Sequence, residues 1–121
     1  MRKTIKIGEK EFEFEANLGT ADLYQSFTGE NLFEKLASFK GIKSDAPEAW
    51  RVLDVYKRMM YVMNVQATHS EVKEMRARMN EDSYLAWTFQ FGPSDINLNN
   101  VNEIVKLWQS TRETHSTPKN P

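Results

Sequence analysis

The side chains that could bind a metal or move protons are few and are poorly spaced for either task. The two histidines, His69 and His115, lie far apart in the sequence, and neither has a second histidine one helical turn away. The chain of 121 residues contains no cysteine, which excludes disulfides, thiolate metal sites and a cysteine nucleophile. We therefore interpret both histidines as solvated residues and expect no metal and no cofactor.

Acidic side chains occur close together, but their pattern is not typical of a catalytic pair. Glu11, Glu13 and Glu15 alternate with phenylalanines, which indicates the solvent-facing side of a strand. Glu81 and Asp82 form another acidic pair, adjacent in the sequence. None of the five glycines belongs to a phosphate-binding loop, a nucleophile elbow or a dinucleotide-binding motif. The sequence predicts that the protein is not an enzyme.

Charge and hydropathy exclude two further classes of partner. The 16 basic and 17 acidic residues give a net charge of -1, without the basic surface that nucleic-acid binding requires. Residues 1–6 carry basic side chains but no signal-peptide apolar run, and nowhere do eighteen apolar residues follow one another. We expect a protein of the reducing cytosol that binds neither nucleic acid nor membrane.

Methionines are frequent in two neighbouring segments that we expect to be helical. Met59, Met60 and Met63 belong to the most apolar segment of the chain, so filling an irregular core explains them best. Met75 and Met79 lie among charged residues instead. Because methionine side chains are flexible and polarizable, these two are the better candidates for contact with another protein.

Aromatic side chains provide the other candidates. Trp87, Phe89 and Phe91 cannot all face inward from one helix, because residues two apart point in roughly opposite directions. At least one should be exposed or should contact a partner, although a second layer of the protein's own fold explains the pattern equally well. The candidate protein-binding residues are Met75, Met79, Trp87, Phe91 and Trp108.

The N-terminal segment has the alternation of a β-hairpin. Apolar and charged residues alternate over 4–16, interrupted by Gly8-Glu9. A two-residue turn there places Ile5 opposite Phe12. The hairpin should therefore bury one face, formed by Ile5, Ile7, Phe12 and Phe14.

Capping signals divide the middle of the chain into helices. We expect a short helix from Thr20 to Gly29 and a second one capped by Asn31. Start signals at residues 45–48 predict a long central core helix that ends near Gln66. If Leu53 of that helix is in the core, Leu53→Ala should lower the free energy of unfolding by roughly 2 to 5 kcal/mol.

The C-terminal half is expected to contain further helices. Thr68 and Glu71 form a capping-box pattern, and Asn80 restarts the chain, so residues 69–91 form either one bent helix or two. A last helix ends near Trp108. Residues 109–121 lack large apolar side chains, which predicts a disordered tail.

These elements together predict an α+β fold. We expect an N-terminal β-hairpin packed on a bundle of about five helices. Residues 1–108 should form one domain, and residues 109–121 a flexible tail.

The arrangement of the whole chain resembles one protein family. The residues that carry the resemblance are the hairpin sequence over 4–14, Glu-Ile-Val-Lys-Leu-Trp-Gln at 103–109 and Ser-Thr-Pro-Lys at 116–119. The chain resembles the tail assembly chaperones of long, non-contractile-tailed phages and prophages of Gram-positive bacteria. The resemblance covers essentially the whole chain.

The resemblance implies a role in tail morphogenesis. A protein of this family, in the host cell cytoplasm, binds the long helical tape measure protein, keeps it soluble and recruits tail tube subunits to it. It is absent from the finished virion. Such chaperones are made in two forms by ribosomal frameshifting, and this chain resembles the shorter form, with Lys119-Asn120 compatible with a slippery codon pair. Self-association as a homo-oligomer is also compatible with this role.

Two other functions remain as alternatives. A structural neck or tail-completion protein would be retained in the virion. A transcriptional or anti-repressor module would fit the short helices, but the near-neutral charge and the lack of a basic recognition helix argue against it.

Overall fold

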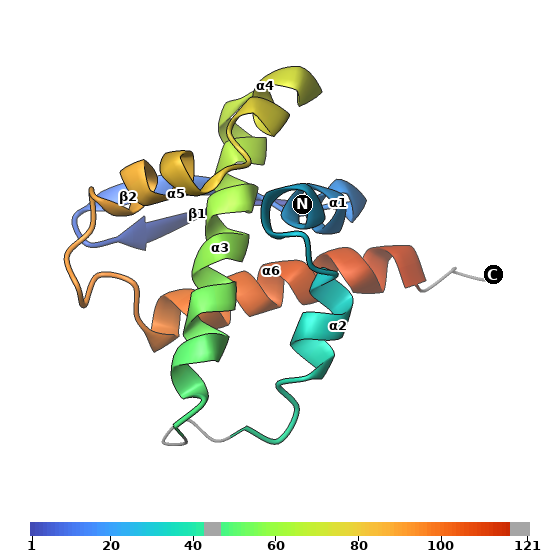
Figure 1. The fold of residues 1–121 in the computed structure, drawn as a ribbon, viewed down its shortest axis with the longest axis vertical. Coiled ribbons are helices and arrows are strands. Elements are labelled where there is room, and N and C mark those ends of the chain that lie inside the picture. Colours follow the sequence, from blue (N-terminus) through green and yellow to red (C-terminus); the bar gives the residue numbers. More distant parts are fainter. Residues whose placement is uncertain (43–46, 117–121) are drawn as a thin grey trace.

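The computed structural model of the protein describes residues 1–42 and 47–116. Within these residues a two-stranded antiparallel sheet packs on six helices, which confirms the expected α+β class with about one helix more than predicted (Figure 1). The elements are β1 (Arg2–Ile7), β2 (Lys10–Glu15), α1 (Leu18–Thr28), α2 (Leu32–Ala37), α3 (Ala49–Thr68), α4 (Val72–Ala77), α5 (Glu81–Thr88) and α6 (Leu98–Ser116).

The hairpin has the predicted register. Ile5 is paired with Phe12, and Gly8 in the turn has a φ of 64°, a left-handed conformation that favours glycine. Ile5, Ile7 and Phe14 are buried, while Phe12 is partly buried at the edge of the core. The alternation therefore identified the buried face correctly.

Helix α3 is the central helix of the fold, as predicted. It packs against β2, α1 and α6, and Met59, Met60 and Met63 are fully buried in its middle. Its N-terminal end projects past α6 (Figure 1). Leu53, in the second turn of α3, is 39% exposed, so the prediction that it lies in the core is wrong.

The observed caps correct two of the predicted helix boundaries. Asn17 caps α1, and Thr20 is the reciprocal member of its capping box. Thr68 ends α3, where its hydroxyl donates to the Asn64 carbonyl at 2.8 Å, so the Thr68–Glu71 capping box is wrong. Asn80 caps α5 as expected, so the helical part of 69–91 consists of two helices, α4 and α5. Of the start signals for α3, Asp45 and Ala46 lie outside the described residues.

The last helix continues beyond the predicted boundary at Trp108. Helix α6 extends to Ser116, so the prediction of disorder from Gln109 onward is wrong up to that residue. Thr111 is buried, and its hydroxyl donates to the Ala16 carbonyl at 3.0 Å. This polar contact with the end of the hairpin gives the segment a packing site without a large apolar side chain. Residues 117–121 of the expected tail lie outside the described residues.

Candidate protein-binding site

The structure places three of the five predicted contact residues in the core. Met79, Trp87 and Trp108 are buried, while Met75 and Phe91 are partly buried against the core. A partner cannot reach the three buried side chains in this conformation, so they do not form a contact surface. The corrected interpretation is that they pack the protein's own core, which for Trp87 is the alternative that the sequence left open.

The aromatic residues among them belong to different clusters. The rings of Trp87 and Phe91 are in edge contact, with centroids 4.9 Å apart, whereas Trp108 of α6 contacts Phe33 of α2 at 5.5 Å. Phe89 is 80% exposed, which agrees with the expectation that one aromatic residue of this segment must face outward. Phe91 lies beyond the end of α5 at Thr88, so the helical spacing that places residues two apart on opposite sides does not apply to it.

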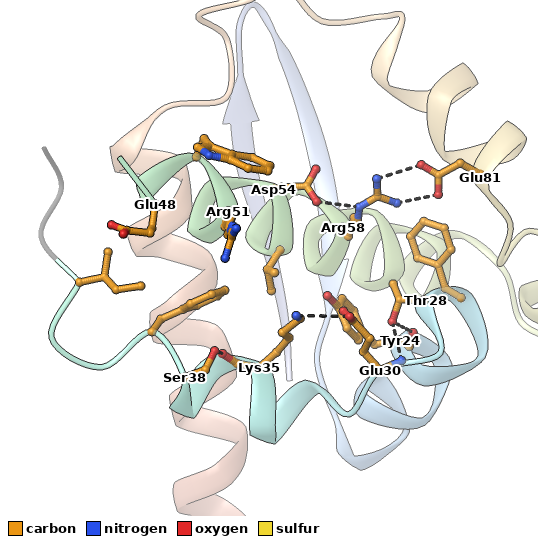
Figure 2. Close-up of a pocket in the computed structure, with 15 residues that line it drawn as sticks. Tyr24, Thr28, Glu30, Lys35, Ser38, Glu48, Arg51, Asp54, Arg58 and Glu81 are labelled. Atoms are coloured by element: carbon orange, nitrogen blue, oxygen red, sulfur yellow. Dashed lines mark hydrogen bonds and ion pairs between the residues drawn. The ribbon is translucent and has the colours of Figure 1, made fainter. Parts of the chain in front are cut away.

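A polar cleft of about 640 Å³ lies between α1, α2 and the first half of α3 (Figure 2). Its most connected side chain is Arg58, whose guanidinium donates to both carboxylate oxygens of Glu81, at 2.7 and 2.8 Å, and to Asp54 at 3.1 Å. The hydrogen bonds from Arg58 lower the pKa of the Glu81 carboxyl. The guanidinium also lies over the Tyr84 ring, 4.4 Å from its centroid. Arg58 therefore ties α3 to α5.

The charges of this cleft mostly neutralise one another. Besides the Arg58 pairs, Lys35 forms an ion pair with Glu30 at 3.3 Å (Figure 2). The described residues contain no group of His, Asp and Glu side chains that could hold a metal ion. We interpret the cleft as a structural clamp between helices, because few of its charges remain free to recognise a ligand.

Two tyrosines beside the clamp provide a test of the aromatic core. The ring centroids of Tyr61 and Tyr84 are 5.6 Å apart. The Tyr61 hydroxyl donates to the Arg78 carbonyl at 2.7 Å, whereas the buried Tyr84 hydroxyl has no hydrogen-bond partner among the described residues. Tyr61→Phe should lower the free energy of unfolding by about 1 kcal/mol, and Tyr84→Phe should leave it unchanged or raise it by up to about 1 kcal/mol. Urea denaturation of the two variants measures the difference, and equal losses would contradict it.

An apolar hollow lies on the other side of the first half of α3. It has a volume of about 450 Å³ and adjoins a second hollow of about 170 Å³ through Leu53 and Ile96, which line both. We call the two hollows together the apolar trough. Trp50 and Leu98, at its rim, are 65% and 67% exposed. The side chains that form the trough are those of Ile42, Ala49, Trp50, Val52, Leu53, Tyr56, Lys57, Thr88, Phe91, Pro93, Ile96, Asn97, Leu98 and Val101, together with Gly92.

Local hydrogen bonds hold the loop that forms one wall of the trough. The backbone N–H of Gly92 donates to the Asp95 carboxylate at 2.8 Å. Asn97 and Asn100 then exchange side-chain hydrogen bonds, with each amide oxygen accepting from the other's backbone N–H, at 2.9 and 3.2 Å. The Asn100 side chain also donates to the Lys6 carbonyl of β1 at 3.2 Å. Ile96 and Leu98 are thereby fixed at the trough.

Sequence reasoning missed this surface because it assigned the apolar residues of α3 to the core as a group. Trp50 and Leu53 have the same residue types as core positions, so composition could not separate them. Their position in the helix could have separated them from the core residues. Both lie in the first two turns of a long helix, and the end of a long helix can extend beyond the elements that a small domain packs around it.

Comparison with protein-family models, with curated proteins and with solved structures finds no match to this chain. Among the residues that the structure describes, no helix is long and apolar enough to cross a membrane.

Proposed function

We propose that this protein is a tail assembly chaperone that binds the tape measure protein, keeps it soluble and recruits tail tube subunits to it during phage tail morphogenesis. The proposal rests on the resemblance carried by the hairpin and by the C-terminal motifs. It places the protein in the host cell cytoplasm and outside the finished virion.

The observation that best supports a binding role is the apolar trough. Single exposed apolar residues are ordinary on protein surfaces, but Trp50, Leu53 and Leu98 gather around one hollow. An apolar hollow of this kind suits the apolar face of a helix. A long, largely helical tape measure protein would present many such faces, so weak individual sites would act together through avidity.

Co-expression with the tape measure protein tests this function. We expect the chain to be captured with that protein and to increase the fraction of it that stays soluble. If a folded chain leaves the solubility unchanged and does not co-purify, the chaperone function is wrong. Mass spectrometry of purified virions separates the main alternative, because a neck or tail-completion protein would be present in the particle.

A further inference from the structure

We propose that the apolar trough binds one amphipathic helix of the partner protein, and that an acidic residue beside the apolar stripe of that helix pairs with Lys57. This inference deepens the proposed function by assigning the site and the chemistry of the segment that it binds. The trough lies between the N-terminal half of α3, the loop at 91–97 and the start of α6.

The form of the binding partner follows from a stripe on α3. Ala49, Val52 and Tyr56 are spaced by three and four residues, and the same spacing leads on to Met59 and Met63. The two methionines are fully buried by this chain, whereas the first three residues line the open trough. A helical stripe packs best against another helix, whose side-chain ridges fit its grooves. Among the residues that the structure describes, the stripe therefore continues past the part of α3 that is fully covered, and over its first two turns it borders an open hollow.

The charge of the binding partner follows from Lys57. It is the only charged side chain among the described residues that line the trough. Within the described residues, no carboxylate forms an ion pair with its ammonium group. A partly buried cation next to apolar side chains attracts an anion more strongly than an exposed one does. An acidic residue beside the apolar stripe of the bound helix would supply that anion.

A second copy of this chain fits the trough less well. In a two-fold dimer the same surface is contributed by both copies, so Lys57 would face a trough in which another Lys57 is the one charged lining side chain that the described residues supply. Like charges at a contact oppose association. Charge complementarity therefore favours a different protein with an acidic helix.

Two synthetic peptides serve as probes of this site. Each has about 18 residues, roughly 27 Å when helical, and the same leucine stripe at helical spacing. One carries glutamates beside the stripe, and the other carries lysines at the same positions. Fluorescence anisotropy of labelled peptide against the purified chain gives Kd for each. We expect the glutamate peptide to bind at least about threefold more tightly, with a difference that shrinks as salt is added.

Matched variants assign the binding to the trough. Lys57→Glu should reverse the preference between the two peptides, whereas Lys73→Glu, the same change on the exposed surface of α4 at the other end of α3, should not (Figure 1). Leu98→Asp should weaken binding of both peptides by about tenfold or more. Its control is Leu18→Asp, because Leu18 is also the first residue of a helix and is 68% exposed, against 67% for Leu98. Aspartate is favourable in the first turn of a helix, so both variants should fold, as circular dichroism verifies.

The inference would be overturned if neither peptide bound, if the preference were insensitive to Lys57→Glu, or if the two leucine variants had equal effects. A chain that dimerises, and whose dimer dissociates in Leu98→Asp alone, would also overturn it by assigning the trough to a second copy. The test is separate from that of the proposed function. Peptide binding without rescue of the tape measure protein would refute only the chaperone role, whereas rescue that is insensitive to Lys57 and Leu98 would refute only the site.

Discussion

Phe14→Ala is expected to lower the free energy of unfolding by about 3 to 5 kcal/mol. Phe14 has no exposed surface, and it projects from β2 into the core that the hairpin shares with α3. Removing its ring leaves a cavity in a fully buried part of the core, and incomplete collapse around that cavity adds to the lost transfer free energy of the ring. Urea denaturation followed by circular dichroism measures the loss.

Leu53→Ala is the control for this result. Leu53 is 39% exposed at the trough, so Leu53→Ala should lower the free energy of unfolding by less than about 1 kcal/mol. This loss is below the range expected for a core position. Similar losses for Phe14→Ala and Leu53→Ala would mean that the core extends over the first half of α3, and that the trough is closed in solution.

Raising the pH above about 10 is expected to destabilise the protein through two buried tyrosines. Burial raises the pKa of Tyr24 and of Tyr84 to about 12 each, from the ordinary value near 10. The folded state therefore holds these protons more tightly than the unfolded state does. The resulting stability is fully present below pH 10 and is lost as the pH rises through 12, by about 2 kcal/mol for each tyrosine at pH 12.

Denaturation curves at a series of alkaline pH values measure this dependence. Lysine side chains also titrate in this range, but they are common to the wild-type protein and to its variants. Between pH 10 and 12, the free energy of unfolding should decline less in Tyr24→Phe and in Tyr84→Phe than in the wild type. The difference at pH 12 should equal the contribution of the removed tyrosine, about 2 kcal/mol. A variant with the wild-type slope would show that its tyrosine is not protected by burial.

The parts of the fold that depend on neighbouring residues could be predicted from the sequence. The register of the hairpin follows from the alternation around Gly8-Glu9, and Asn31 and Asn80 cap the helices expected of them. Each of these features is determined within a few residues, so no knowledge of distant contacts was needed.

The parts that depend on distant residues could not be predicted. The helix beyond Trp108 is anchored by a hydrogen bond from Thr111 to Ala16, at the far end of the sequence. Whether a tryptophan is buried depends on which element of the fold packs over it. The ring of Phe33 in α2 packs against the buried Trp108, whereas Trp50 is 65% exposed. The five candidate contact residues were therefore chosen by residue type, and three of them belong to the core. The trough is formed by residues of α3, the 91–97 loop and α6, which are distant in the sequence and meet only in the folded chain.

We propose that the apolar trough is the surface that holds the tape measure protein in solution. Three forms of the chain can be compared for their ability to keep the co-expressed tape measure protein soluble. We expect wild type and Leu18→Asp to raise the soluble fraction equally, and Leu98→Asp to lose most of that effect although it remains folded. Equal rescue by Leu98→Asp and Leu18→Asp would contradict the claim.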